Sequence, residues 1–297
     1  MSSNHALQRV KRLFSAAKAG HTGSLDPAAS GLLPICFGKA TKISGLLLDS
    51  DKYYQVSARF GEKTDSGDLE GRVIERGDGC ALDQGEFARI VAGFQGESEQ
   101  VPPMHSALKH QGKRLYKLAR AGETVKRSPR KICLHQLKLT EYSPDGFTLI
   151  VAASKGTYIR TLVEDIAAKA GCLAVTTDLR RIGLGPWPPT AFTAIDNSDP
   201  SVHMITLETL ESIKKEQGTA GLDHVILPVD SALQSYPAVV LDRESTYYIR
   251  HGHPVFVAKA PQTGWFRLYG PDDLFLGMGE VLDDGRVAPR RMFAALQ

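Results

Sequence analysis

Apolar residues follow two different periods along the first 230 residues, and each period predicts a different kind of element. Spacings of three and four residues, which place apolar side chains on one face of a helix, predict four helices. Alternating apolar and polar residues, or a short apolar run between turns, predict five strands. The helical stretches are residues 5–18, 39–48, 157–170 and 205–216, and the strand stretches are residues 32–37, 53–60, 131–141, 147–153 and 174–184. Together they predict a mixed α/β (α+β) fold.

The pattern changes near residue 230. The sequence LPVD at residues 227–230 is typical of a domain edge. From about residue 235 onward the apolar runs are short and are separated by Gly, Pro and Asp turns, which favours a small β-barrel. We therefore predict two domains, residues 1–230 and residues 231–297.

Composition places the chain among ordinary globular proteins. It has 297 residues, of which 42% are hydrophobic and 23% charged. No apolar run approaches the roughly 18 residues that span a bilayer, and the N-terminus lacks the apolar core of a signal peptide. We therefore expect a soluble protein of the cytoplasm that has no membrane partner. The four cysteines are far apart and without a C-x-x-C pair, so they predict neither a zinc site nor a disulfide framework.

Several classes of enzyme lack their sequence motifs here. The chain contains no G-x-x-x-x-G-K-[ST], no G-x-G-x-x-G and no G-x-S-x-G, which argues against nucleotide hydrolysis, dinucleotide binding and a serine nucleophile elbow. The zinc deaminase signature is also absent. The acidic loop at residues 64–71 lacks the regular acid spacing of a calcium loop. We expect neither a metal nor an organic cofactor.

Positive charge is concentrated in residues 102–131, which we call the basic segment. It holds nine Lys and Arg residues against one acid, Glu123, whereas the whole chain carries a formal net charge of only +3. Such a local excess on a mildly acidic body favours contact with a phosphate backbone. The alternative is a solvated or partly disordered insertion, and Gly112, Gly122 and Pro129 fit a projecting segment under either interpretation.

Residues 20–31, GHTGSLDPAASG, hold three glycines and a proline and therefore predict a tightly shaped loop. Asp26 is the ionisable carboxylate in this loop, and Pro27 favours an extended backbone at that residue. One interpretation is that Asp26 caps a helix beginning at Pro27. The complete string, however, resembles the catalytic loop of the TruB family of tRNA pseudouridine synthases, which reads G-H-T-G-x-L-D-P-x-A-[ST]-G.

Further segments resemble the same family, in order, along nearly the whole chain. They are YQVSARFG at residues 54–61 with the loop up to residue 71, PPMHSALK at 102–109, SKGTYIRT at 154–161, LRR at 179–181 and the tail at 277–291. The resemblance implies a pseudouridine synthase fold with a mixed sheet and an RNA-binding cleft, an RNA-gripping insertion at the basic segment, and a C-terminal PUA-like β-barrel. It also implies isomerisation of uridine to pseudouridine at position 55, in the T loop of tRNA, without a cofactor.

The resemblance assigns catalysis to three residues. Asp26 is the catalytic carboxylate, acting as nucleophile or base, and Arg160 pairs with it. A buried carboxylate has to stay ionised for either role, and a guanidinium favours its ionised form because it is always charged and can bind bidentately. Tyr54 stacks on the uracil that is flipped out of the RNA. Its hydroxyl could also remove the C5 proton, although the ordinary pKa of a phenol makes it a reluctant base.

The resemblance also implies residues that bind the substrate. His21 stacks on neighbouring bases, Tyr158 and Leu179 line the uracil pocket, and Asp68 hydrogen-bonds a base edge. For Tyr158 and Leu179 core packing is an alternative, and Asp68 is otherwise a solvated loop acid. The expected RNA contacts of the basic segment are Lys109, Lys113, Arg114 and Lys117.

Two other functions remain open. A non-catalytic tRNA-binding and folding module would need only the basic segment and the barrel, and the presence of Asp26, Tyr54 and Arg160 argues against it. A guide-RNA-dependent relative is the other alternative, and the self-contained basic segment argues against it. We therefore expect tRNA, gripped at its T-arm, as the partner, without a guide RNA or a protein partner.

The sequence departs from the family pattern at two places. The family has a further strand and a Lys-Pro element before the position of Met1, so we expect either a start that lies upstream or a missing edge strand. Val175 stands where relatives often carry His, so the contacts near Leu179 are expected to differ.

Overall fold

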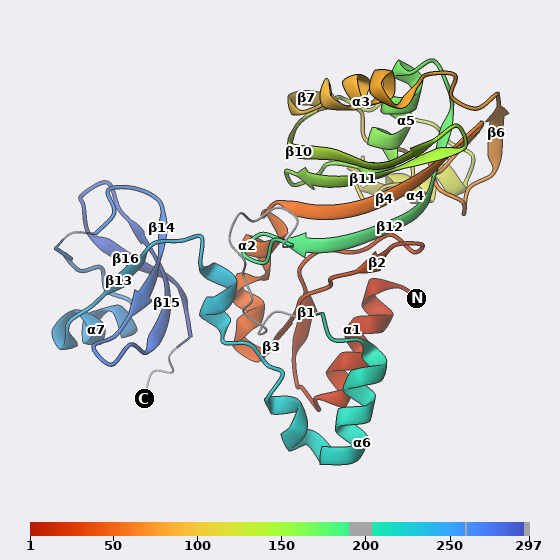
Figure 1. Cartoon of the computed structure of the whole chain (residues 1–297). Coiled ribbons are helices and arrows are strands. Elements are labelled where there is room, and N and C mark those ends of the chain that lie inside the picture. The colour runs from red at the N-terminus through yellow and green to blue at the C-terminus, as the bar shows by residue number, and fades with distance from the viewer. Residues whose placement is uncertain (190–203, 259, 294–297) are drawn as a thin grey trace.

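The computed structural model describes residues 1–189, 204–258 and 260–293. The description leaves out residues 190–203 of the first predicted domain and residues 259 and 294–297 of the second. Figure 1 shows a larger body built around one sheet, an N-terminal group of helices and short strands beside it, and a smaller C-terminal sheet. In the part of the chain that is described, no helix is long and apolar enough to cross a membrane.

A mixed six-stranded sheet forms the centre of the larger body. In spatial order its strands are β2 (Ser30–Gly31), β12 (Ala174–Leu184), β4 (Lys52–Phe60), β11 (Gly146–Ala153), β10 (Arg130–Ser143) and β7 (Gly96–Gln100). The neighbours are antiparallel except β2, which runs parallel to β12. The mixed α/β fold predicted from the sequence is therefore confirmed, and the four longest of these strands lie where the apolar pattern predicts them.

Two helices, α3 (Gln84–Ala92) and α5 (Ile159–Lys169), cover one face of this sheet (Figure 1). The apolar residues of β4 that alternate with polar ones, Val56, Ala58 and Phe60, point to this face and are buried. β11 lies between β4 and β10, and its side chains are mostly apolar and mostly buried. Phe87 of α3 is completely buried and packs against aromatic rings from three strands of the sheet.

The N-terminal group begins with α1 (Ser3–Leu13), which packs on α6 (Leu207–Asp223). The predicted helix at residues 5–18 is shorter than expected, because the chain turns at Ser15, which has a positive φ of 49°. The predicted helix at 205–216 runs further than expected, past a kink at Gly218. The other elements of this region are β1 (Ala19–His21), β3 (Ile35–Phe37), η1 (Gly38–Ile43) and α2 (Ser44–Leu48). The stretch at 39–48, predicted as one helix, consists of the 3-10 helix η1 followed by the α-helix α2.

Short elements lie in the long connections between the strands of the large sheet. β5 (Glu62–Thr64) pairs with β6 (Val73–Arg76) after β4. In the basic segment, β8 (Lys109–His110) and β9 (Lys113–Arg114) form a hairpin that leads into α4 (Leu115–Arg120). Leu115 and Leu118 of α4 are buried, so the segment is a folded unit with its own apolar anchor.

The C-terminal part contains a four-stranded sheet. After η4 (Val229–Leu233) come β13 (Ala238–Val240), α7 (Arg243–Arg250), β14 (Trp265–Tyr269), β15 (Phe275–Val281) and β16 (Val287–Met292). The strands lie in the order β13-β14-β15-β16, and the two outer strands do not pair with each other in residues 204–258 and 260–293. The predicted PUA-like β-barrel is therefore not confirmed, because the described residues show no closed barrel. One stretch expected to hold strands is the helix α7, whose N-terminus is capped by Asp242.

Replacing Phe87 by alanine tests the packing that joins α3 to the sheet. We expect Phe87→Ala to lower the free energy of unfolding by about 3–5 kcal/mol, because Phe87 is completely buried and its removal leaves a cavity among the aromatic rings that surround it. Urea unfolding monitored by circular dichroism measures the change. Ile74→Ala is the control, since Ile74 on β6 is 60% exposed and its truncation should leave the urea midpoint nearly unchanged.

Candidate active site

The loop that carries Asp26 connects β1 with β2. Pro27 does not begin a helix: the chain makes a turn in which the amide of Ala29 donates to the carbonyl of Asp26 at 3.0 Å. The interpretation of Asp26 as a helix cap is therefore wrong. Gly31, at the end of the loop, has a φ of +100°, and a Cβ there would lie 2.2 Å from the carbonyl oxygen of Arg181, so this close approach to β12 requires glycine.

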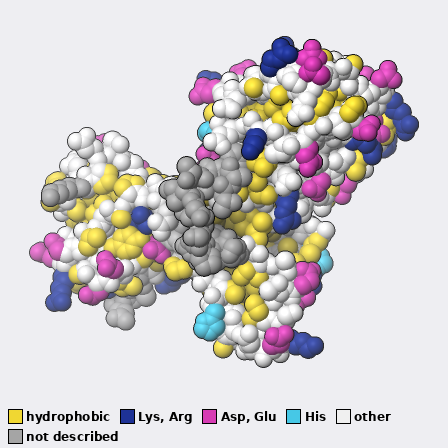
Figure 2. All heavy atoms as spheres, in the orientation of Figure 1, with side chains coloured by type: hydrophobic (Ala, Val, Ile, Leu, Met, Phe, Trp, Pro, Cys, Tyr) yellow, Lys and Arg dark blue, Asp and Glu magenta, His cyan; other side chains and the backbone are white. Residues whose placement is uncertain are grey.

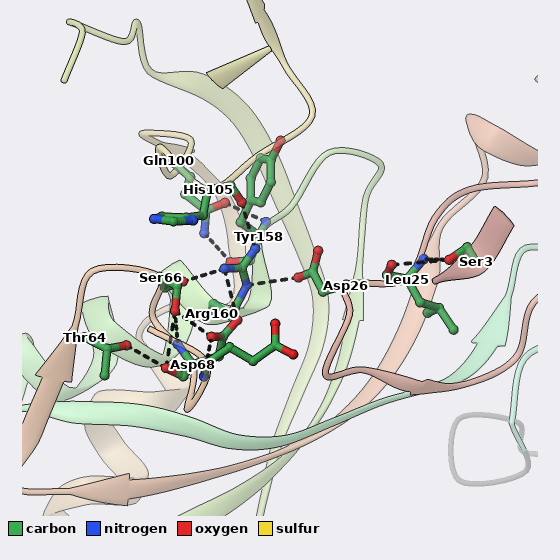
Figure 3. Close-up of polar contacts among 11 residues, drawn as sticks. Ser3, Leu25, Asp26, Thr64, Ser66, Asp68, Gln100, His105, Tyr158 and Arg160 are labelled. Carbon is green, nitrogen blue, oxygen red and sulfur yellow. Dashed lines mark hydrogen bonds and ion pairs between the residues drawn. The ribbon is translucent and has the colours of Figure 1, made fainter. Parts of the chain in front are cut away.

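The first helix holds this loop in place. The Ser3 hydroxyl accepts from the amide of Leu25 at 2.8 Å and donates to the carbonyl of the same residue at 3.3 Å (Figure 3). On the other side of the loop, the amide of Thr22 donates to the carbonyl of Pro34 at 3.2 Å. These bonds hold the backbone that leads into Asp26, and the bond to Pro34 joins it to the chain beyond the loop.

Arg160, in the first turn of α5, lies between two carboxylates. Its Nε lies 2.9 Å from Asp26 Oδ2, and its Nη1 lies 3.3 Å from Asp68 Oδ2 (Figure 3). The Arg160 side chain is only 6% exposed, whereas that of Asp26 is 43% exposed. The ion pair is therefore buried on its cationic side and open to solvent on the side of Asp26.

The remaining donors of Arg160 reach backbone oxygens. Nη1 also donates to the carbonyl of Ser66, and Nη2 donates to the carbonyl of His105 at 3.0 Å. The start of α5 is fixed by Gln100, whose amide accepts from the Tyr158 N–H at 2.8 Å and donates to the Tyr158 carbonyl at 3.0 Å. Sequence analysis did not identify Ser66 or Gln100. No local motif marks them, because they reach Arg160 and Tyr158 only through the fold.

Asp68 is buried, unlike the solvated loop acid that its sequence position suggests. Its Oδ1 accepts from the Ser66 hydroxyl at 2.5 Å and from the amide of Glu70 at 3.1 Å, while Oδ2 faces Arg160. Its side chain is 9% exposed. Both carboxylate oxygens are therefore occupied by protein donors, which leaves Asp68 little capacity to contact a base and makes it a support for Arg160.

A small cavity opens between these groups. It is lined by residues that include Asp26, Asp68, Arg160, Thr176 and Leu179, and its volume of about 20 Å³ is enough for one water molecule. Leu179 also packs against the apolar core under α5, which is the core-packing alternative that the sequence left open. Since the cavity is too small for a nucleobase, a base that reaches Asp26 has to occupy its solvent-exposed side.

Tyr54, on β4, lies directly across from Arg181 of β12 and is hydrogen-bonded to it. Burial raises the pKa of the Tyr54 phenol above its ordinary value, while the charge of Arg181 and this hydrogen bond act in the opposite direction. Burial likewise raises the pKa of Tyr158, and the nearby Ser106 hydroxyl opposes that effect. A raised pKa means that a smaller fraction of each phenol is ionised at neutral pH, so less of the phenolate is available as a base.

Other candidate residues lie around this centre. His21 ends β1 opposite Ile35, and its Nδ1 is buried without a hydrogen-bond partner in the described part of the chain. Val175 is completely buried beside Thr176, on β12. Among the described residues there is no group of three or more His, Cys, Asp or Glu side chains placed to hold a metal ion.

The predicted RNA-contacting residues of the basic segment lie on its short hairpin and helix. All four are exposed, at positions Lys109, Lys113, Arg114 and Lys117. The segment reaches the site itself through the bond that the His105 carbonyl accepts from Arg160. On the face shown in Figure 2, by contrast, basic and acidic side chains of the larger body are interspersed.

Two solved structures share this fold at low sequence identity. A chain in the "Structure of H/ACA RNP bound to a substrate RNA containing 2'-deoxyuridine" matches with a TM-score of 0.72 and 20% identity, covering 99% of this chain and 82% of that chain. A chain of a Cbf5-Nop10-Gar1 complex matches with a TM-score of 0.69 and 21% identity, covering 95% and 75%. These similarities establish the class of fold, a mixed α/β domain built on one sheet and followed by a C-terminal β domain.

Sequence comparison identifies the family. The model described as TruB family pseudouridylate synthase (N terminal domain) matches residues 11–159, and two TruB C-terminal models match residues 160–234 and 237–293. Proteins named tRNA pseudouridine synthase B from Nitrosococcus oceani and Pseudomonas aeruginosa are 49% and 47% identical to this chain. They match over 98% of this chain and over 91% and 92% of their own lengths. The chain belongs to the TruB family of pseudouridine synthases, as its loop at residues 20–31 predicts.

Replacing Arg160 tests whether the buried guanidinium stabilises the site. We expect Arg160→Met to lower the free energy of unfolding by about 3–5 kcal/mol, because Asp68 keeps a buried charge without its cation. Urea unfolding measures the loss. The matched control is Arg59→Met, which breaks an exposed pair with Glu62 and should cost less than about 1 kcal/mol. Adding Asp68→Asn to Arg160→Met should recover part of the loss; a double variant no more stable than Arg160→Met would contradict this explanation.

Proposed function

We propose that this protein is a tRNA pseudouridine synthase, an isomerase that converts uridine to pseudouridine at position 55 in the T loop of tRNA. The observation that carries the proposal is the pair of Asp26 and Arg160, a solvent-accessible carboxylate held at 2.9 Å by a buried guanidinium. The names of the relatives that are 47–49% identical over nearly the whole chain support the same substrate and reaction.

The reaction detaches uracil from its ribose, rotates it and rejoins it through carbon, so it needs neither an oxidant nor a reductant. A carboxylate can begin it as a nucleophile or as a base, provided that it is ionised. Arg160 lies 2.9 Å from Asp26 and presents a fixed positive charge to it, because a guanidinium stays charged at any pH at which the protein is folded. Asp26 is therefore the catalytic group in this proposal, and Arg160 positions it.

The target uridine has to leave its stack to reach Asp26. We place the flipped uracil on the solvent side of Asp26, with Tyr54 stacking on it and available to accept the C5 proton. Leu179 and Tyr158 border the base in this arrangement, and His21 stacks on neighbouring nucleotides. Asp68, with both oxygens engaged by protein donors, acts through Arg160 in this proposal and does not contact the base.

The tRNA is gripped at its T-arm by the exposed cations of the basic segment. The geometry that supports this is the link between the segment and the site, because the carbonyl of His105 accepts a hydrogen bond from the same Arg160 that holds Asp26. Since this segment belongs to the chain itself, the proposal needs no guide RNA and no protein partner. The protein would act in the cytoplasm, where unmodified tRNA is available. A purely non-catalytic binding module would not require the buried support under Asp26.

Asp26→Asn tests the chemistry. The neutral amide is nearly the same size but is neither a nucleophile nor a base, so we expect pseudouridine formation to be abolished while tRNA binding stays close to wild type. Mass-spectrometric mapping of pseudouridine in unmodified tRNA, together with tritium release from C5-labelled uridine, measures the activity. Asp49→Asn is the control, because Asp49 is an exposed acid paired with Lys155. Full turnover by Asp26→Asn would refute the assignment.

Neutralising the basic segment tests the grip on RNA. We expect the triple change of Lys113, Arg114 and Lys117 to Gln to weaken tRNA binding. The dependence of log K on log salt should become shallower by about 0.7–0.9 for each phosphate that the variant no longer neutralises. Filter binding at several salt concentrations measures both effects. A triple change of the exposed Arg72, Arg76 and Arg89 to Gln removes the same charge from other elements and serves as the control. Equal slopes for the two triple variants would show that the segment is not the grip.

A further inference from the structure

Arg181 is a buried cation to which the proposed function assigns no role. It lies on β12, only 2% exposed, and is among the largest fully buried side chains of the described residues. The register of β12 against β4 pairs it with Tyr54, and the next pair along the same face, Leu179 with Val56, belongs to the apolar core. Arg181 and Tyr54 thus form the polar end of the core, next to the Asp26 loop.

The donors of Arg181 connect three segments that are far apart in the sequence. Nε donates to the carbonyl of Leu32 at 2.7 Å, and Nη2 donates to the carbonyl of Gly23 at 3.2 Å. The guanidinium also makes a side-chain hydrogen bond to Tyr54. The Arg181 carbonyl in turn accepts from the amide of Leu32 at 2.8 Å. The same side chain therefore sets the position of Tyr54 and of the loop that carries Asp26.

Within the described residues, Arg181 has no carboxylate at ion-pair distance. Its hydrogen bonds go to two neutral carbonyls and one phenol, and Lys52, two residues before Tyr54 on β4, adds a like charge nearby. A buried cation without a counter-charge is costly. The one group hydrogen-bonded to Arg181 that can become an anion is Tyr54, so the pair gains electrostatic energy when the phenol is ionised.

We propose that Arg181 is a positioning residue that holds Tyr54 against the Asp26 loop and stabilises its phenolate, the form that accepts the C5 proton late in the reaction. This inference rests on the proposed function. In the step concerned, the C5–H bond breaks and its proton passes to the phenolate oxygen. The electron pair of that bond restores the C5=C6 double bond of uracil. The bonding pair that C6 gives up at the same time moves onto N1, or onto the leaving group if one is bonded to C6. The phenol then returns its proton to solvent.

The charges around Tyr54 set the expected pH dependence. Burial and the Asp26 carboxylate raise the pKa of the phenol, whereas Arg181 lowers it. Only the phenolate can accept a proton, so the fraction of competent enzyme rises with pH until Tyr54 is ionised. Removing the cation raises the pKa of Tyr54 further. The rate of C5 proton removal then falls at neutral pH and recovers only at higher pH.

Single-turnover kinetics with uridine deuterated at C5 test the inference. We expect Arg181→Gln to slow pseudouridine formation at pH 7 by about ten- to hundredfold, since each pKa unit changes the phenolate fraction tenfold. The C5 isotope effect should rise from near unity in the wild type to well above unity. The midpoint of the pH–rate profile should move to higher pH by about one to two units. Incorporating 3-fluorotyrosine at position 54, which lowers the phenol pKa, should restore part of the rate of Arg181→Gln. Arg180→Gln, on the exposed face of the same strand, should keep the wild-type isotope effect.

The inference would be overturned if Arg181→Gln is folded and slower but keeps the wild-type isotope effect and the wild-type pH profile. That result would mean that Arg181 has only a structural role. If Arg181→Gln does not fold, Arg181→Lys decides, because it keeps a cation at a shorter reach. We expect a smaller isotope effect of the same kind, and a slow Arg181→Lys variant without one would overturn the inference. Absence of pseudouridine from the wild-type reaction would instead refute the proposed function, so the two failures are distinguishable.

Discussion

The buried guanidinium of Arg160 is the constraint that the rest of the site satisfies. A charge with so little exposure is tolerated only where its hydrogen bonds are made and a counter-charge is near. Asp26, Asp68 and the carbonyls of Ser66 and His105 meet that requirement from three separate connections. Because Asp68 is itself buried and fully engaged, Asp26 is the carboxylate of this group that solvent, and therefore a substrate, can reach.

The apolar core determines where these polar groups can lie. β4 and β12 carry apolar side chains toward α5 until the core ends, and the next cross-strand pair is Tyr54 and Arg181. A guanidinium at this boundary packs its stem against the core while its donors reach the carbonyls of the Asp26 loop. Two arginines thus support the same loop, Arg160 through the carboxylate and Arg181 through the backbone.

The basic segment is connected to the site by structure as well as by charge. Its apolar anchors, Leu115 and Leu118, fix the hairpin and helix that display the cations, and His105 joins its start to Arg160. An RNA held by these cations would therefore be bound by an element that contacts Arg160, the residue that supports the proposed catalytic carboxylate. In the proposed function this arrangement makes binding and the positioning of Asp26 parts of one network.

The sequence by itself determined the family, through the loop at residues 20–31, and most of the long strands, because local periodicity decides which residues alternate between faces. It also singled out Asp26, Tyr54 and Arg160 by resemblance. Only the tertiary structure decided that Asp68 is buried beneath Arg160, because a loop and a helix far apart in the sequence meet there. It also decided that Arg181 lies across from Tyr54, because strand register joins residues that no local pattern links. The predicted C-terminal barrel is likewise not confirmed by the described residues. Short apolar runs mark strands, but they do not determine whether the edges of a sheet meet.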